Sequence, residues 1–335
     1  MIRPLVSILT PFRNTGSYLP ACITSILNQS YDNWELLLVN DSSSDNSSQI
    51  VESFAKNDTR IKLLNNHGIG IIHALRLAMA NSSGQFITRM DSDDVMATTK
   101  LETMVHTLVT NGKGYIALGK VAYFSHTKVS AGYLAYEAWL NSLTKRGTNF
   151  EEIYKECPIA SPCWMIYKED LEKCGAFNYN NYPEDYDLCF RFYKAGYKCL
   201  PSTALLHHWR DYDTRTSKTN KNYNLEAFNK LKTSYFLELD YDDSRPLVVF
   251  GAGLKGKIVA KELLKQNILF HWISMNPNKS NKRIYEQELL GMNSFNKLEN
   301  PQSIITFAHA ESQKQFHKYF KKPQMKQNKD YFLFC

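Results

Sequence analysis

The first 90 residues alternate between short apolar runs of strand length and stretches whose apolar side chains recur at helical spacing. Alternation of this kind is typical of a parallel sheet with helices on both of its faces. Ligands of such sheets bind at the carboxyl ends of the strands. The pattern therefore predicts an α/β fold with a ligand site at one edge of the sheet. The predicted elements are strand 5–9, helix 19–29, strand 34–39, helix 47–56, strand 61–64, helix 69–80 and strand 85–90.

Polar residues follow three of these strands at the points where the strands end. They are the segment 10–14, the pair Asn40-Asp41 and the acidic run Asp91-Ser92-Asp93-Asp94. Because the carboxyl ends of parallel strands meet at one edge of a sheet, we expect the three groups to converge. Three carboxylates within four residues repel one another, and a divalent cation offsets that repulsion. The acidic run therefore predicts a metal site, with capping of a helix near Thr98 as the alternative.

The composition is that of a soluble globular protein of about two domains, with 335 residues of which 43% are hydrophobic and 22% charged. No apolar run approaches the ~20 residues that a membrane-spanning helix needs, and the N-terminus carries no signal-peptide pattern. The seven cysteines are scattered and never spaced Cys-x-x-Cys, which argues against a disulfide framework or a zinc site. These features predict reduced thiols and a cytoplasmic location.

The net charge of +7 is concentrated in the last part of the chain. From Arg245 onward, 15 Lys and Arg face 6 Asp and Glu, a balance of +9, which leaves −2 for the first 244 residues. A basic excess usually forms a solvated surface, and it can also bind an anionic partner such as RNA or the inner face of a membrane. Both alternatives stay open at this point.

Three ordered motifs resemble those of family 2 glycosyltransferases with the GT-A fold. Residues 6–14, Leu38-Val39-Asn40-Asp41-Ser42-Ser43-Ser44-Asp45 and Arg89-Met90-Asp91-Ser92-Asp93-Asp94 look like the family's start, nucleotide loop and DxD motif. The resemblance covers roughly residues 1–215. It implies metal-dependent transfer of a sugar from a nucleotide-sugar, most often a UDP-sugar, to a hydroxyl of a surface glycan or lipid-linked oligosaccharide.

On the nucleotide side, the resemblance implies roles for four residues. Asp41 would hydrogen-bond the uracil base, Thr10 and Pro11 would line the base pocket, and Asn14 would follow them on the donor side. The alternative for Asp41 is a plain Asx turn. Phe12 stands where the family often has tyrosine, which keeps a stacking face and loses a hydroxyl.

On the diphosphate side, the resemblance implies that Asp91 faces the ribose and that Asp93 binds Mn²⁺ or Mg²⁺ through the diphosphate. His207 is a further candidate metal ligand beside Asp91 and Asp93. Arg210 and Arg215 are candidate diphosphate clamps, because arginine binds phosphate oxygens in pairs. A histidine or arginine in these positions can equally be a packed or surface residue.

The segment around Glu184-Asp185 resembles the acceptor side of the family and precedes an amphipathic helix with Leu188, Phe192 and Tyr193 inward. The resemblance implies that Asp185 is the general base and that Glu184 orients it. Acidic residues also favour helix N-termini for electrostatic reasons, which is the structural alternative. Because no second carboxylate is identified as a nucleophile, we expect one displacement with inversion of configuration.

A glycine-rich turn, Gly251-Ala252-Gly253-Leu254-Lys255-Gly256, lies between the predicted strand 247–250 and helix 257–266. Read alone, this GxGxxG pattern favours a dinucleotide site and an NAD-dependent oxidoreductase. However, the next strand, 269–274, ends in Met275-Asn276 and not in the acidic residue that would hold a ribose. We therefore expect a Rossmann-like accessory domain that binds a nucleotide, an anion or nothing.

The predicted organisation is a GT-A domain over 1–215, a helical linker over 216–244 and a smaller Rossmann-like α/β domain over 245–335. This pairing resembles the β-1,3-N-acetylglucosaminyltransferase-like group, which includes queuosine-tRNA galactosyltransferases. The resemblance implies tRNA as an alternative acceptor, which positive side chains would bind through its phosphates. A non-catalytic scaffold is the remaining alternative, and the intact acidic motifs argue against it.

Overall fold

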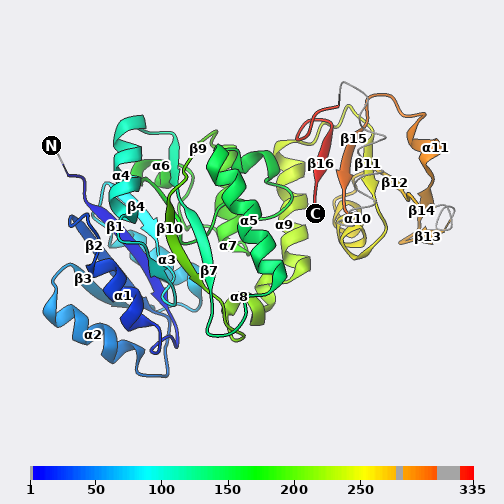
Figure 1. The fold of residues 1–335 in the computed structure, drawn as a ribbon. Helices are drawn as coiled ribbons and strands as arrows, with labels where there is room; N and C mark the ends of the chain where they lie inside the picture. Colours follow the sequence, from blue (N-terminus) through cyan, green and yellow to red (C-terminus); the bar gives the residue numbers. More distant parts are fainter. Residues whose placement is uncertain (1–2, 277–281, 308–324) are drawn as a thin grey trace. The chain divides into compact units, whose positions relative to one another are not determined.

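The computed structural model describes residues 3–276, 282–307 and 325–335 of the chain. It divides the chain into two compact units (Figure 1). The first unit comprises 1–150 and 158–219, and the second comprises 151–157 and 220–335. Helix α9 (Leu225–Leu239) belongs to the second unit. The predicted boundaries, with 216–244 as a separate linker, stay a prediction.

The predicted alternation of strands and helices over the first 90 residues is confirmed. Strands β1, β2, β3 and β4 are parallel neighbours in one sheet, in the order β3-β2-β1-β4. These elements are β1 (Val6–Phe12), α1 (Leu19–Leu27), β2 (Trp34–Asn40), α2 (Ser47–Asn57), β3 (Ile61–Asn65), α3 (Ile71–Ala80) and β4 (Phe86–Arg89).

Beyond β4 the sheet becomes mixed, so the parallel sheet predicted from the first 90 residues is only part of a larger one. Its full order is β3-β2-β1-β4-β8-β6-β9, and β8 runs antiparallel to both β4 and β6. The simple strand–helix repeat ends at β4, and β8 enters the sheet only after a long excursion of the chain. The added elements are α4 (Lys100–Asn111), β6 (Tyr115–Leu118), η1 (Asn149–Glu152), β8 (Trp164–Tyr167), α6 (Lys168–Lys173), α7 (Glu184–Lys194) and β9 (Lys198–Leu200).

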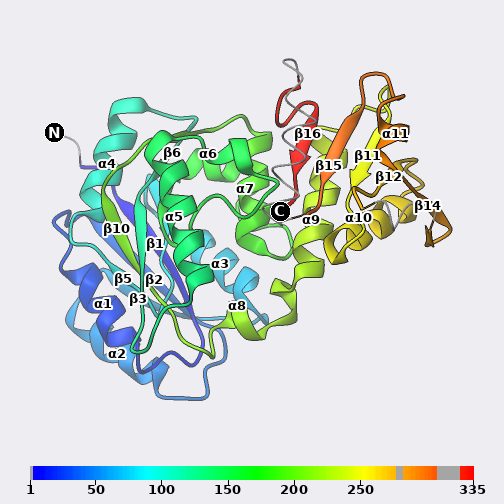
Figure 2. The same cartoon turned by 45° about the vertical axis from the view of Figure 1, so that its right-hand side comes forward.

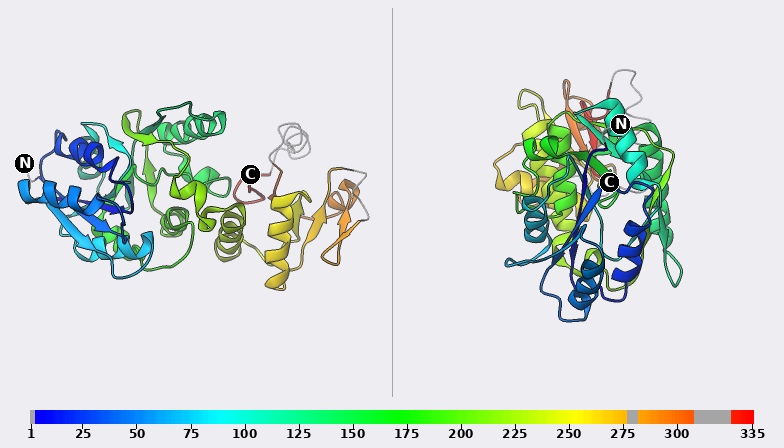
Figure 3. Two further views of the ribbon diagram at one scale, coloured as in Figure 1. Left: turned by 90° about the horizontal axis from the view of Figure 1, so that it is seen from below. Right: turned by 90° about the vertical axis from the view of Figure 1, so that its left-hand side faces the viewer.

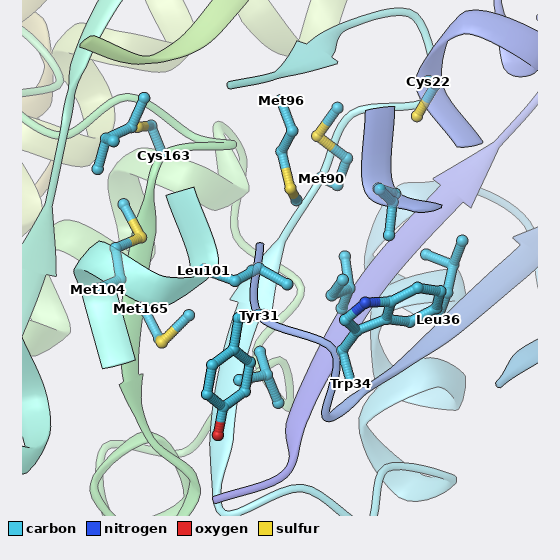
Figure 4. Close-up of a cluster of buried hydrophobic side chains, with 14 of the residues drawn as sticks. Cys22, Tyr31, Trp34, Leu36, Met90, Met96, Leu101, Met104, Cys163 and Met165 are labelled. Carbon is cyan, nitrogen blue, oxygen red and sulfur yellow. The ribbon is translucent and has the colours of Figure 1, made fainter. Parts of the chain in front are cut away.

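Both faces of this sheet are covered, which explains why its strands are continuous apolar runs and not alternating ones. All residues of β2 from Trp34 to Val39 are buried. Residues of α1, α2 and α4 pack with one face of β1, and α3 lies on the other side of the sheet (Figure 2). The core on the first face is rich in methionine, with Met90, Met96, Met104 and Met165 close together (Figure 4).

A small second sheet brings the chain after residue 204 beside the acidic run. Strand β10 lies between the other two strands of this sheet, antiparallel to β5 and parallel to β7. Its pairing sets His207 opposite Met96, just after the acidic run. The elements concerned are β5 (Val95–Met96), β7 (Lys120–Phe124), α5 (Ala131–Arg146), β10 (Leu205–Arg210) and α8 (Thr216–Thr219).

The second unit contains one six-stranded sheet in the order β13-β14-β12-β11-β15-β16. Apart from β13 its strands are parallel, and their order in the chain, 3-2-1-4-5, is that of dinucleotide-binding sheets. The yellow helix α10 lies beside this sheet (Figure 3). The elements are η2 (Lys221–Tyr223), β11 (Leu247–Phe250), α10 (Leu254–Lys265), β12 (His271–Ile273), β13 (Arg283–Ile284), β14 (Gln287–Leu290), α11 (Met292–Phe295), β15 (Gln302–Ile305) and β16 (Tyr331–Leu333).

The glycines of the predicted turn have distinct structural uses. Gly251 has a φ of 99°, a conformation that favours glycine. Gly256 lies so close to the turn that an added Cβ would be 2.0 Å from the Gly251 carbonyl oxygen and 2.8 Å from Thr306 Oγ1. Gly253 has open space around it. The turn therefore packs α10 tightly against β11 through Gly256.

Among the described residues, no helix is both long and apolar enough to cross a membrane.

This packing predicts that two alanine substitutions differ in how much they destabilise the second unit. Gly256→Ala should lower the free energy of unfolding of the second unit by about 1–3 kcal/mol, because backbone atoms cannot move aside cheaply. Gly253→Ala, the matched control, should cost less than about 1 kcal/mol, since the position is open and only the N-cap preference is lost. Urea unfolding with amide hydrogen exchange in α10 measures both, and equal effects would contradict the packing argument.

Candidate active site

Hydrogen bonds join the loops that follow β1, β2 and β4 at the carboxyl edge of the large sheet. Thr15 Oγ1 donates to Ser92 Oγ at 3.1 Å, which links the loop after β1 to the acidic run. Asn14 Oδ1 accepts the backbone N–H of Ser44 at 2.7 Å, and the N–H of Asn14 donates to Ser43 Oγ at 3.1 Å. Asn14 is exposed and has a φ of 51°. The polar groups expected at this edge therefore lie within one connected set of loops.

Asp41 is almost fully buried at the end of β2. Its Oδ1 accepts hydrogen bonds from Asn66 Nδ2 at 2.7 Å and from the N–H of Gly70 at 3.0 Å. Within the described chain, its Oδ2 receives no hydrogen bond and can accept one from a base. Thr10 and Pro11 are buried within β1, where they pair with β2. Their side chains therefore contribute to the floor of this edge and not to its exposed surface.

The acidic loop, residues 91–94, carries three carboxylates in different surroundings. Asp91 Oδ1 accepts from Arg89 Nε at 2.9 Å. Asp93 Oδ2 accepts from the Tyr212 hydroxyl at 2.8 Å. Burial, followed by the charges of Asp94 and Asp91, raises the pKa of Asp93 to about 7. The ionised form of Asp93 is therefore disfavoured first by burial and then by its two acidic neighbours.

The donor set suits a hard divalent cation. Asp91 and Asp93 each keep one carboxylate oxygen without a hydrogen bond from any described residue, and a cation would favour the ionised form of Asp93, which burial and the neighbouring acids disfavour. In the described ranges, no three His, Cys, Asp or Glu side chains are grouped to hold a metal ion. Such a cation would therefore need oxygen atoms of a substrate, as Mg²⁺ does when one or two carboxylates and a phosphate bind it.

Asp94, the third acid, is fully buried and serves the scaffold of the loop. Its Oδ1 accepts the N–H of Arg210 at 2.7 Å, and its Oδ2 lies 2.9 Å from His207 Nε2. His207 Nδ1 in turn faces Lys100 Nζ at 3.5 Å, and Lys100 donates to the Pro162 carbonyl. Burial raises the pKa of Asp94 and lowers that of His207. Both ring nitrogens of His207 therefore face protein groups. To bind a metal ion, His207 would have to give up its contact with Asp94 or with Lys100.

Two arginines bring positive charge to the acidic loop. Arg210 Nε donates to the Asp93 carbonyl at 2.6 Å, and its guanidinium lies over the rings of Tyr18 and Phe124. Its two Nη atoms make no hydrogen bond to any residue that the structure describes. Arg215 lies over Trp209 and close to the acidic loop. Burial lowers the pKa of its guanidinium, but the charges of Asp94 and Asp93 outweigh burial and raise it.

Glu184 and Asp185 form the first turn of α7, as predicted for a helix beginning there. Glu184 is buried, and its Oε1 accepts from Arg89 Nη1 at 3.0 Å. Asp185 is half-buried, and its Oδ1 accepts the N–H of Tyr186 at 2.8 Å. Burial and then the charge of Glu184 raise the pKa of Asp185 to about 7, while Arg89 opposes the shift. A carboxylate with this pKa is matched to proton transfer near neutral pH.

Sequence reasoning missed Arg89, Lys100 and Tyr212, and it assigned no role to Asp94. Arg89 joins Asp91 to Glu184, and Tyr212 joins the segment after β10 to Asp93. Arg89 lies two residues before the acidic loop, but no local pattern indicates that it pairs with Glu184. The pairings of Arg89 with Glu184, of Lys100 with His207 and of Tyr212 with Asp93 each join residues more than 90 positions apart in the chain, which no local pattern reveals.

The family comparisons agree with this geometry. The family model described as "Glycosyl transferase family 2" matches residues 7–175. An uncharacterized glycosyltransferase of Haemophilus influenzae is 36% identical over 68% of this chain and 72% of its own length. The UDP-Glc:alpha-D-GlcNAc-diphosphoundecaprenol beta-1,3-glucosyltransferase WfgD of Escherichia coli is 41% identical over 33% of this chain and 44% of its own length. The chain spans only 24–34% of three other curated relatives.

A solved structure shares the fold. The S. aureus TarS fragment 1–349 in complex with UDP-GlcNAc matches with a TM-score of 0.56 and 17% identity, over 77% of this chain and 71% of that one. Its likeness supports the fold alone. The family model covers half of this chain, and the Haemophilus relative matches over two thirds of both chains. The chain therefore belongs to glycosyl transferase family 2, and its fold is of the GT-A type.

Proposed function

We propose that the protein transfers a sugar from a nucleotide-sugar, a UDP-sugar, to a hydroxyl of a lipid-linked oligosaccharide or surface glycan, with inversion and with a divalent metal. The observation that carries the proposal is a pair of contacts to the acidic loop: Thr15 joins the loop after β1 to Ser92, and Arg89 joins Asp91 to Glu184, the chain neighbour of Asp185. The names of two similar proteins support the donor and acceptor classes, since WfgD acts on a diphosphoundecaprenol and TarS was solved with UDP-GlcNAc.

Donor binding would use groups that the edge leaves available. Asp41 Oδ2 would accept from the base, while the loop that includes Asn14 would close beside it and β1 at Thr10 and Pro11 would form the floor. Asp91 and Asp93 would hold Mn²⁺ or Mg²⁺, which would stabilise the charge on the departing diphosphate. His207 would join this shell only by leaving Asp94 or Lys100.

The transfer itself would be one in-line displacement. Asp185 would take the proton from the acceptor hydroxyl, and the acceptor oxygen would attack the anomeric carbon as its bond to the nucleoside diphosphate breaks. Glu184 would fix the position of Asp185 at the start of α7. Arg210 and Arg215 would donate to the diphosphate, since the Nη atoms of Arg210 are free of described protein partners.

Two alternatives remain to be tested, one for the acceptor and one for the reaction. The basic excess after residue 244 favours an anionic partner, so tRNA belongs in any acceptor panel. The 3-2-1-4-5 strand order of the second unit favours NAD(H) as a ligand to test for the oxidoreductase alternative. We place the protein in the cytoplasm, at the inner face of the membrane if its acceptor is lipid-linked.

Neutral variants of the two acidic groups test the proposal. Over a panel of UDP-, GDP- and dTDP-sugars with Mn²⁺ and candidate acceptors, the unmodified protein should release nucleotide from one donor. Asp93→Ala and Asp185→Asn should each reduce that rate by roughly 100-fold or more, the scale of lost general-base catalysis. Asp187→Asn, two residues along α7 and paired with Arg191, is the matched control and should retain most of the activity of folded protein. Equal losses in all three variants would contradict the assigned roles.

The raised pKa of Asp185 predicts a pH dependence. The base acts only when it is ionised, so kcat/KM should fall as the pH drops through about 7 and should level off above it. Saturating Mn²⁺ keeps Asp93 ionised, and the acid limb measured there should therefore report Asp185. A pH profile that stays flat from 5.5 to 8 would argue against Asp185 as the base.

A further inference from the structure

We propose that Arg89 is a positioning residue that holds the donor-side carboxylate Asp91 and the base-bearing start of α7 in one fixed geometry. The inference rests on the proposed function and deepens it, because it identifies how the two halves of the site are kept in register. Nothing in the local sequence of Arg89 indicates this role.

The geometry is that of one buried cation shared by two acids. Arg89 lies at the carboxyl end of β4 and is 6% exposed. Its Nε donates to Asp91 Oδ1 at 2.9 Å, and its Nη1 donates to Glu184 Oε1 at 3.0 Å. Glu184 is also 6% exposed. Buried charges require partners, so each of the three groups constrains the other two.

The guanidinium is suited to this task because its donors lie in one rigid plane. Nε and Nη1 point in fixed directions, and they therefore set the two carboxylates at a fixed separation. Asp185 is bonded directly to Glu184 in the chain, at the first turn of α7. Holding Glu184 thus holds Asp185 relative to Asp91, and displacement of a reacting group by about 1 Å can cost 10²-fold in rate.

Arg89 also balances charge around the base. The charged groups that act on Asp185 are Glu184 and Asp91, which disfavour its ionised form, and Arg89, which favours it. Removal of the arginine takes away the positive charge that favours the ionised form of Asp185 and leaves the charges of Glu184 and Asp91 in place. Removal of the charge of Glu184 favours the ionised form of Asp185. Removal of the charges of Arg89 and Glu184 together leaves the net charge beside Asp185 unchanged.

A second buried pair on the same helix provides a comparison. Arg191 Nε donates to Asp187 Oδ2 at 2.8 Å, and Arg191 Nη1 donates to the Cys174 carbonyl at 2.7 Å. Both side chains are as buried as those of the Arg89 pair. Asp187 and Cys174 belong neither to the acidic loop nor to the base, so loss of Arg191 should affect stability alone.

The experiment measures nucleotide release and transfer from pH 5.5 to 9 for the full chain with Mn²⁺ and the donor identified in the panel. Arg89→Met should lower kcat roughly 100-fold at pH 7 and move the acid limb up by about one pH unit or more. Arg89→Lys should keep the acid limb near its original pH while losing rate, since it keeps the charge and loses the fork. Arg191→Met should lower the thermal midpoint and leave the acid limb in place.

Charge-balanced variants make the test sharper than a single substitution. Glu184→Gln should move the acid limb to lower pH, and the double variant Arg89→Met/Glu184→Gln should bring it back close to that of the unmodified protein. This return is a readout that simple destabilisation does not produce. Thermal midpoints of every variant identify any that fail to fold, and the Arg89→Lys and Glu184→Gln profiles then decide the outcome.

The possible failures are distinguishable. If the unmodified protein releases no nucleotide from any donor, the proposed function fails and this inference falls with it. If the unmodified protein is active and Arg89→Met keeps its kcat and its acid limb, the inference alone is overturned. An equal shift of the acid limb in Arg191→Met would also overturn it, because it would reduce the effect to general loss of a buried cation.

Discussion

The site depends on an imbalance of charge that the fold keeps at one edge of a buried sheet. The acidic loop follows β4 directly, and α7 brings two further acids to it. Asp94 is hydrogen-bonded by the Arg210 N–H and by His207, and the charge of Arg89 compensates Asp91 and Glu184. The Asp93 carboxylate accepts a hydrogen bond from Tyr212 and is near the charge of Arg215, yet burial and the neighbouring acids raise its pKa to about 7. The remaining charge is what a metal–diphosphate pair would complete.

Much of the fold could be predicted from the sequence because the pattern of apolar residues in each strand and helix is local. Strands buried on both faces are continuous apolar runs, so β1 to β4 and β11 could be located within a few residues. The later, mixed part of the sheet was beyond this reasoning, since β8 and β6 are short and their pairing joins distant segments. The glycines of the second unit were predicted as a turn. The close approach of Gly256 to the Gly251 carbonyl depends on how α10 packs, which the sequence pattern does not reveal.

The candidate site was predictable only as far as residues lie at strand ends and helix starts. Asp41, Asp91 and Asp185 could be named because each stands at such a position. Arg89 could not, since a single arginine at the end of a strand has no pattern, and its partner Glu184 lies 95 positions away. The surroundings of His207 were equally hidden, because burial and the contacts with Asp94 and Lys100 depend on the small second sheet.

The two kinds of buried pair in the first unit differ in what they leave unsatisfied. Arg191 and Asp187 are neighbours on one helix, and their further hydrogen bonds, from Arg191 to the Cys174 carbonyl and from Asn181 to Asp187, lie outside the acidic loop. Arg89 instead divides its donors between two carboxylates that also have other demands, namely a predicted cation at Asp91 and the position of the base beside Glu184. A buried ion pair adds little net stability compared with apolar packing, so a shared arginine at this place is better explained by geometry than by stability. The same division of one cation between two acids lets the charge of the donor side influence the base across the site.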